Sequence, residues 1–385
     1  MKAKASYLLL FFGVLLVNPA VAGNIPEALE SALPPPELSA KTWILMDYNT
    51  GWVLASKNAD ERIETASLSK IMTSYAVFHE LKEGNINLDD LVHISKKAWR
   101  TGGSRMFIEV DTKVSVEDLL KGVIVQSGND ASVALAEYVA GSEDAFAARM
   151  NEYARKLGMV NSNFTNAPGL PDPDHYSTAH DLSIVTAAMI REFPEFYKWY
   201  SQREFTFNDI TQHNRNLLLN RDPTADGVKT GYTKAAGYGL IGSAVRDGMR
   251  LIAAVTGTSN RMRRAKEVQS LLTFGFSTYN SQQLAKGGVP VTDIKVYKGD
   301  QDQVGIGVFE PLYLTAPRDN KIKITTRLNT PPWIIAPVSP GMEMANIEVL
   351  VGEQKLMRYP LVALHPVGEG AWWERALDSV LLWFE

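Results

Sequence analysis

Hydrophobic and polar positions follow three different patterns along the 385-residue chain. From about Pro34 to Tyr279, short apolar runs typical of strands stand at both ends of a long stretch with helical spacing. Beyond Gly287 the positions alternate, and from Ala371 they return to helical spacing. The pattern therefore predicts a mixed domain, a small all-β domain and a terminal helix.

The predicted strands of the mixed domain lie near its two ends. Residues 43–46 and 52–55 flank a glycine turn and predict an antiparallel hairpin. Strand patterns return at 227–230, 239–245 and 250–256, after the helical stretch. We expect an α+β fold in which both ends of the domain form one antiparallel sheet and a helical region is inserted between them.

Alternating segments separated by proline and glycine turns predict the small β domain. They are 291–297, 304–308, 312–316, 321–328, 344–350 and 358–363. We expect the mixed domain to span 23–282, the β domain 283–366 and the terminal helix 367–385.

The terminal helix is amphipathic. Apolar side chains such as Trp373, Leu377 and Phe384 share one face, and acidic residues dominate the other. The helix is shorter than the roughly 20 residues that span a bilayer, so we expect it to lie on a membrane surface with its tryptophans at headgroup depth. Packing on its own β domain or on a partner chain is the alternative, because such helices usually carry a Lys-rich polar face.

Residues 1–22 predict a signal peptide. Lys2 and Lys4 precede the apolar run 7–17, and small residues end the segment just before Gly23. A short membrane anchor is the alternative, but the run is too short for a span of roughly 20 residues.

Composition excludes several classes of function. The chain carries 39 basic and 43 acidic side chains, and loss of the signal peptide would remove two lysines, so nucleic acid is not an expected partner. There is no cysteine, which excludes disulfides, thiolate nucleophiles and Cys-ligated metals. His175 and His180 are the closest histidine pair, and we interpret them as surface-loop residues. No metal or other cofactor is expected.

A serine and a lysine stand three residues apart at the predicted start of a helix. Residues three apart lie on the same helix face, and Lys70 stands among core-like residues such as Ile71. Burial and the positive end of the helix should lower the pKa of Lys70, which would place a general base beside a nucleophile. The alternative is an ordinary helix start, with serine capping and the lysine side chain reaching water.

Two further motifs favour the catalytic interpretation of Ser67 and Lys70 over an ordinary helix start. Residues 127–129 read S-G-N between an apolar run and a helical segment, and 229–231 read K-T-G at the end of a strand. Together with S-x-x-K, such triplets are the signature of penicillin-binding proteins and class A β-lactamases, which usually have S-D-N in the middle.

The wider context resembles the low-molecular-mass D-alanyl-D-alanine carboxypeptidases of the penicillin-binding protein 5 and 6 type, peptidase family S11. The similar stretches are 104–107, 127–131, 204–208, 214–216 and 226–238. The resemblance implies a serine β-lactamase/DD-peptidase-like domain that removes the terminal D-alanine from peptidoglycan pentapeptide stems, and it implies β-lactam antibiotics as covalent inhibitors. It also implies a periplasmic enzyme, held on the outer face of the bacterial inner membrane by its C-terminal helix.

The resemblance also implies catalytic roles. Ser67 matches the acylated nucleophile, Lys70 its base, and Ser127 the relay that carries a proton to the leaving amine. Asn129 would bond the substrate backbone or Lys70. The backbone N–H groups of Ser67 and Tyr232 would form the oxyanion hole.

Substrate binding is expected along the K-T-G strand. Lys229 would hold a positive charge near Ser127, while Thr230 and Arg215 would bind the terminal carboxylate. For Arg215 an ordinary surface cation is the alternative. Gly231 is expected to be glycine because a side chain there would collide with the substrate.

Other polar residues receive structural interpretations. We expect Asp130 to cap a helix, and Arg261, Arg263 and Arg264 to form a solvated basic face. Tyr232 stands where relatives commonly have histidine, a departure that bears on the deacylation rate.

Competing functions remain open on the sequence. A DD-endopeptidase, a transpeptidase or a weak β-lactamase would use the same fold, although the chain lacks a Glu-x-x-Leu-Asn loop for a deacylating base. A non-catalytic peptidoglycan-binding protein is the alternative outside enzymology.

Overall fold

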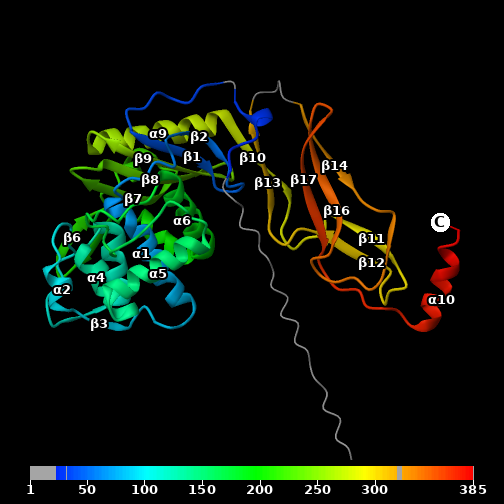
Figure 1. The fold of residues 1–385 in the computed structure, drawn as a ribbon, viewed down its shortest axis with the longest axis horizontal. Coiled ribbons are helices and arrows are strands. Elements are labelled where there is room, and N and C mark those ends of the chain that lie inside the picture. The colour runs from blue at the N-terminus through cyan, green and yellow to red at the C-terminus, as the bar shows by residue number, and fades with distance from the viewer. Residues whose placement is uncertain (1–22, 32, 319–322, 385) are drawn as a thin grey trace, which may run out of the picture.

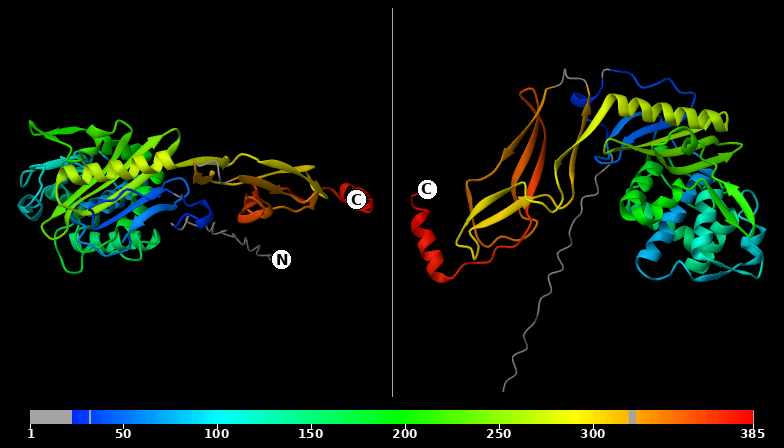
Figure 2. Two further views of the ribbon diagram at one scale, coloured as in Figure 1. Left: turned by 90° about the horizontal axis from the view of Figure 1, so that it is seen from above. Right: turned by 180° about the vertical axis from the view of Figure 1, so that it is seen from behind.

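The protein consists of two bodies connected by a β ribbon, with a helix at the far end. The computed structural model describes residues 23–31, 33–318 and 323–384, so the predicted signal peptide lies outside the described residues. The first body mixes helices and strands, and the second is all β (Figure 1). The two lie in line when viewed from above, and the C-terminal helix is farthest from the first body (Figure 2).

A five-stranded antiparallel sheet, in the order β2-β1-β9-β8-β7, is the base of the first body. Its strands are β1 (Thr42–Asp47), β2 (Val53–Lys57), β7 (Ala225–Thr233), β8 (Gly237–Arg246) and β9 (Met249–Thr258). The prediction of one sheet made from both ends of this domain is confirmed. The K-T-G motif lies on β7, which is an edge strand.

Both faces of this sheet are buried, because successive side chains of a strand point to opposite sides. Ile44 and Ile252 pack against the inserted helical region, whereas Leu45 and Leu251 pack against α9 (Arg261–Thr278) on the other face. The sheet therefore lies between two layers of helix.

The inserted region contains mainly helices and two small two-stranded sheets. Its helices are α1 (Lys70–Lys82), α2 (Lys96–Arg100), α3 (Val116–Lys121), α4 (Asn129–Ala140), α5 (Glu143–Lys156), α6 (Ala179–Glu192), α7 (Pro194–Tyr197) and α8 (Leu218–Arg221). One small sheet pairs β3 (Leu91–His93) with β4 (Lys113–Ser115), and the other is the hairpin of β5 (Glu204–Phe207) and β6 (Ile210–His213).

Helix α1 is the central helix of this region. It continues from a single 3₁₀ turn, η2 (Ala66–Ser69), and every residue from Lys70 to Phe78 is buried. A helix that is enclosed on all sides belongs to the core. Lys70, in its first turn, consequently has no face open to water.

The second body is formed by β10 (Tyr279–Ala285), β11 (Thr292–Tyr297), β12 (Gln303–Gly307), β13 (Leu312–Pro317), β14 (Ile324–Asn329), β15 (Trp333–Ile335), β16 (Glu343–Val351) and β17 (Gln354–Ala363). Strands β10 and β13 form a ribbon, and the other six form one sheet in the order β14-β16-β17-β12-β11-β15. The predicted all-β character of this part is confirmed.

The two bodies share part of their apolar core. Tyr279, Leu314 and Val349 of the second body belong to the same buried cluster as Leu45 and Leu271 of the first. The expected domain boundary at 282/283 falls inside β10, a strand that follows directly on α9.

The chain ends in α10 (Trp372–Leu381). Over the ranges that the structure describes, no helix is both long and apolar enough to cross a membrane.

Candidate active site

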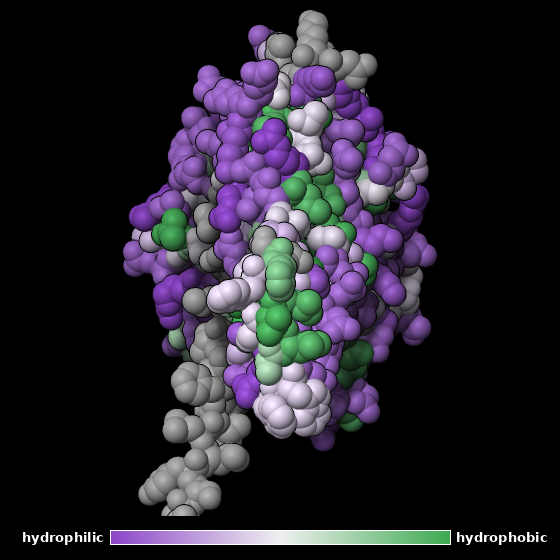
Figure 3. Space-filling view, turned by 90° about the vertical axis from the view of Figure 1, so that its right-hand side faces the viewer, coloured by the Kyte–Doolittle hydropathy of each residue, from purple (hydrophilic) through white to green (hydrophobic). Residues whose placement is uncertain are grey.

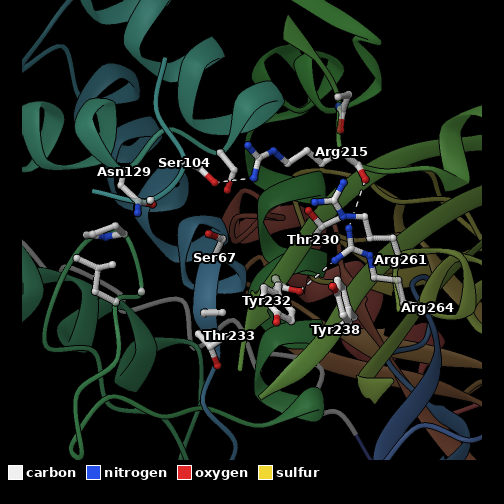
Figure 4. A pocket seen from close by; sticks show the side chains of 18 of the residues that line it. Ser67, Ser104, Asn129, Arg215, Thr230, Tyr232, Thr233, Tyr238, Arg261 and Arg264 are labelled. Carbon is white, nitrogen blue, oxygen red and sulfur yellow. Dashed lines mark hydrogen bonds between the residues drawn. The ribbon is translucent and has the colours of Figure 1, made fainter. Parts of the chain in front are cut away.

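Ser67 lies on η2 and lines a cleft of about 690 Å³. Its side chain points into the cleft, between Asn129 on one side and Thr230 on the other (Figure 4). Ala66, the preceding residue, adopts a left-handed backbone conformation with φ 49°. For a residue other than glycine this conformation costs roughly 1–2 kcal/mol, so the surrounding contacts must hold it in place.

The Lys70 side chain is fully buried and its Nζ has three oxygen neighbours. Nζ lies 2.7 Å from the Asn129 side-chain oxygen, 2.7 Å from the Pro168 carbonyl oxygen and 3.0 Å from Ser67 Oγ. The first two oxygens only accept hydrogen bonds, so they take the two N–H groups of a neutral amine. Its lone pair is then directed at the Ser67 hydroxyl.

Burial is also the main cause that lowers the pKa of Lys70, to about 7, and the charge of Arg215 acts in the same direction. Near neutral pH a substantial fraction of this lysine is therefore uncharged. The hydrogen bonds and the pKa together give Lys70 the properties of a general base for Ser67.

A second wall of the cleft carries Ser127 and Asn129. One turn of π-helix (Gly122–Gln126) leads into Ser127, whose φ of 68° is left-handed. The Ser127 side chain is buried, and its hydroxyl has no hydrogen-bond partner among the described residues. Asn129 accepts from Lys70 and donates to the Gly102 carbonyl at 2.7 Å. Ser127 thus offers a free hydroxyl to a bound substrate, while Asn129 is held in one orientation.

Asp130 organises the loop beside this wall. Its carboxylate accepts hydrogen bonds from the backbone N–H groups of Met106 and Phe107, both at 3.0 Å. It therefore ties the start of α4 to the loop that contains Ser104. The expectation that Asp130 caps a helix was wrong, because the N-cap of α4 is Gly128 and Asp130 lies inside the first turn.

The third wall is β7. Lys229 is 3% exposed, and burial together with the charges of Lys70, Arg215 and Arg264 lowers its pKa well below the usual value. Thr230, the next residue, lines the cleft. An incoming carboxylate would favour the charged form of Lys229, because an opposite charge nearby raises the pKa of an amine.

Gly231 has a structural requirement besides the predicted one. A Cβ atom at this position would lie 2.9 Å from the Thr65 carbonyl oxygen and 2.9 Å from Leu68 Cγ. The missing side chain therefore allows β7 to approach η2, and the expected collision with substrate stays a prediction. This approach brings the backbones of Ser67 and Tyr232 to the same cleft.

Tyr232 forms part of an aromatic pair at the cleft wall. Its ring is 53% exposed and lies 4.2 Å from the Tyr238 ring, centroid to centroid. The guanidinium of Arg264 covers the same Tyr238 ring at 5.6 Å.

The cleft is strongly cationic. Arg215, Arg261 and Arg264 line it, whereas no Asp or Glu among the described residues does so. Arg215 donates to Ser104 Oγ at 2.6 Å, which directs its guanidinium across the cleft (Figure 4). An electropositive cavity of this kind favours an anionic substrate.

The expectation of a solvated face at the three α9 arginines was wrong for Arg264. This residue is 4% exposed and donates to the Gly231 carbonyl at 3.1 Å and to the Gly239 carbonyl at 3.3 Å. Burial lowers its pKa to about 10. It fastens α9 to β7 and β8 below the cleft. Arg261 and Arg263 are exposed, and Arg261 borders the cleft.

The surface-loop interpretation was wrong for His175. It is 3% exposed and lies 2.7 Å from Ser69 Oγ. His180 is partly exposed and pairs with Asp60 at 2.8 Å, but it lies in the first turn of α6 and not in a loop. Across the described ranges, no three side chains of the metal-binding types come together.

Sequence reasoning missed the Pro168 carbonyl, Ser104 and Arg264. A backbone carbonyl leaves no compositional signal, because every residue has one. Arg264 stands in a basic run, where nothing in the sequence distinguishes a buried arginine from solvated ones.

Comparison with known proteins agrees with this geometry. Residues 29–260 match the family D-alanyl-D-alanine carboxypeptidase, peptidase S11, and residues 279–369 match the C-terminal domain of penicillin-binding protein 5.

Individual relatives cover most of the chain. The Escherichia coli K12 D-alanyl-D-alanine carboxypeptidase DacC is 41% identical over 93% of this chain and 91% of its own length. The crystal structure of penicillin-binding protein 5 from Haemophilus influenzae is 40% identical, with a TM-score of 0.80 over 88% of this chain and 100% of that chain. Penicillin-binding protein D2 from Listeria monocytogenes, in its ampicillin-bound form, is 31% identical, with a TM-score of 0.59 over 63% of this chain and 100% of its own.

Proposed function

This chain belongs to the D-alanyl-D-alanine carboxypeptidase family, and we propose that it removes the terminal D-alanine from peptidoglycan pentapeptides through an acyl-enzyme on Ser67. The observation that carries the proposal is Lys70, a fully buried amine with a lowered pKa whose Nζ lies 3.0 Å from Ser67 Oγ. Such an amine has a chemical use beside a nucleophile and little structural use.

Acylation begins when Lys70 takes the proton of Ser67 Oγ as the oxygen attacks the carbonyl carbon between the two D-alanines. The negative charge that develops on the carbonyl oxygen is stabilised by the N–H groups of Ser67 and Tyr232, each worth about 3 kcal/mol to the barrier. The C–N bond then breaks. Ser127 gives its hydroxyl proton to the leaving amine and takes up the proton that Lys70 removed from Ser67, so Lys70 is neutral again. Free D-alanine departs, and water later hydrolyses the ester.

Recognition of the substrate terminus falls to the cationic wall. Thr230 and Arg215 bind the terminal carboxylate, and its negative charge favours the charged form of Lys229, whose pKa is otherwise lowered by burial. The absence of acidic groups from the described lining leaves these cations available to the substrate. A β-lactam carries the same carboxylate and a reactive amide, so it acylates Ser67 and stays bound.

Mass spectrometry after treatment with penicillin tests the proposal. We expect one penicilloyl adduct on Ser67 that persists for minutes or longer, and release of D-alanine from a D-Ala-D-Ala peptide. The Ser67→Ala variant should show neither. Full turnover by Ser67→Ala would refute the mechanism.

The lifetime of the adduct and a peptide-cleavage assay separate the alternative functions. Rapid loss of the adduct with release of penicilloic acid would indicate a β-lactamase, and cleavage of cross-linked dimer peptides in preference to pentapeptides would indicate an endopeptidase. A folded protein that takes up no penicillin would be a binding protein.

We further propose that α10 holds the enzyme on the outer face of the bacterial inner membrane. Its polar side is attached to the β domain, because the Asp378 carboxylate accepts from the Lys298 backbone N–H. Its apolar side is open to solvent, with Leu377 65%, Val380 60% and Leu381 46% exposed. Figure 3 shows a band of apolar surface on the side of the molecule where α10 lies. The exposed face supports contact with lipid over packing on the β domain, and the predicted signal peptide supports a periplasmic location.

A further inference from the structure

A buried chain of hydrogen bonds lies behind the nucleophile. Ser69 Oγ donates to the Ala66 carbonyl oxygen at 2.9 Å and also lies 2.6 Å from Thr65 Oγ1 and 2.7 Å from His175 Nε2. On the other side of the imidazole, the Thr165 backbone N–H donates to His175 Nδ1 at 3.1 Å. The Thr65, Ser69 and His175 side chains are all at most 3% exposed.

These contacts fix the position of every proton. A carbonyl oxygen only accepts, so the single hydroxyl hydrogen of Ser69 goes to Ala66. His175 Nε2 must then donate to Ser69, while Nδ1 has to accept from Thr165. His175 is therefore the neutral Nε2–H tautomer, and burial, which lowers its pKa to about 4, keeps it neutral at physiological pH.

This chain of hydrogen bonds holds the backbone of Ala66, which sets the direction of the Ser67 side chain. Ala66 holds its left-handed φ of 49° directly before the nucleophile, and its carbonyl is the group to which Ser69 donates. Gly169 packs against the same group: a Cβ there would lie 1.9 Å from the Ala66 oxygen. Rotation of the Ala66–Ser67 peptide would move both the Ser67 hydroxyl and its N–H group.

The segment that carries His175 also holds the base. The Pro168 carbonyl oxygen accepts from Lys70 Nζ at 2.7 Å, and the Ala167 carbonyl oxygen accepts from Thr73 Oγ1 at 2.6 Å. Residues 165–175 therefore contact both the nucleophile turn and the first turn of α1.

We infer that His175 is a positioning residue for acylation. It donates to Ser69, Ser69 holds the Ala66 carbonyl, and the fixed Ala66 aims Ser67 at Lys70 and at the oxyanion position. The inference rests on the proposed role of Ser67 as nucleophile.

Kinetics of His175→Ala, His175→Gln and Ser69→Ala test this inference. A displacement of about 1 Å in the nucleophile can cost on the order of 100-fold, so we expect His175→Ala to lower kcat and the rate of acylation by penicillin about 10- to 100-fold with KM nearly unchanged. The Gln amide can donate from a similar position, and His175→Gln should keep the acylation rate within about threefold. Ser69→Ala should lower the acylation rate as much as His175→Ala does. The double variant should acylate no more slowly than either single variant, because both substitutions break the same series of hydrogen bonds.

His180→Ala is the matched control, because it removes a histidine from α6 that pairs with Asp60 outside the cleft. It should change melting temperature without changing acylation. If His175→Ala acylates at the wild-type rate, or if His175→Gln is as impaired as His175→Ala, the inference is overturned. If His175→Ala does not fold, the acylation rates of His175→Gln and Ser69→Ala test the inference instead. Failure of the proposed function would be seen separately, as wild-type protein without an adduct on Ser67.

Discussion

Lys70 shows how strongly a few neighbours change the chemistry of one residue. Lysine is ordinarily a solvated cation. Here the first turn of α1 encloses it, and the Asn129 and Pro168 oxygens take its N–H groups, which leaves the lone pair for Ser67. The S-x-x-K spacing predicted the contact between Ser67 and Lys70. It did not predict Pro168, which lies 98 residues away and contributes only backbone.

Arg215 provides a test of carboxylate recognition at the same scale. Hydrogen bonds to charged groups are worth roughly 1.5–3 kcal/mol, so Arg215→Gln should lower kcat/KM for a D-Ala-D-Ala peptide about 10- to 100-fold. For the same peptide with an amidated C-terminus, the loss should be much smaller.

Arg263→Gln is the control, since Arg263 is exposed on α9 and does not line the cleft. It should leave kcat/KM for both peptides unchanged. Equal losses of kcat/KM for the free-acid peptide and the amidated peptide would show that Arg215 does not bind the carboxylate.

At the scale of elements, the site depends on the close approach of one strand to one turn. Gly231 lets β7 reach η2, and Arg264 of α9 fastens β7 from below by donating to the Gly231 carbonyl. The sequence identified β7 and the start of α1 as the parts that carry the motifs. It gave no signal for their spacing or for the arginine beneath them, because both depend on how α9 packs across the sheet.

Helix α10 is predicted to bind membranes through its apolar face alone. Leu377→Glu should weaken binding to vesicles of phosphatidylethanolamine and phosphatidylglycerol at least about tenfold, because burying a leucine side chain contributes roughly 1.5–3 kcal/mol. Flotation of the protein with vesicles measures the bound fraction.

Ser379→Glu is the matched control. It adds the same charge to the opposite side of α10, so the variant should still float. Binding should also survive 0.5 M salt, because the helix offers lipid mainly apolar contact. Release by salt, or unchanged binding of Leu377→Glu, would contradict this account of anchoring.

At the scale of the whole molecule, the two bodies share a core. Leu314 and Val349 of the β domain lie in the same buried cluster as Leu45 of the sheet. The change from mixed to alternating pattern predicted that there are two bodies. It could not predict the shared cluster, because alternation shows which side of a strand is apolar and not what covers that side.

Leu314→Ala tests this coupling. A leucine-to-alanine change in a core costs about 2–5 kcal/mol, so the temperature at which the enzyme stops taking up fluorescent penicillin should fall by several degrees. Leu361→Ala is the matched control, because Leu361 is fully buried in a cluster made only of β-domain residues. It should leave that temperature nearly unchanged. Equal effects of the two variants would argue against a specific link through the shared cluster.

The measurement that tests the central claim most directly is the pH dependence of Ser67 acylation, followed with fluorescent penicillin between pH 5.5 and 8.5. Burial lowers the pKa of Lys70 to about 7, so the amine is protonated below that pH and cannot accept the Ser67 proton. The account predicts a rate constant that rises with pH through about 7 and then levels off. A rate constant already at its maximum at pH 5.5 would contradict it.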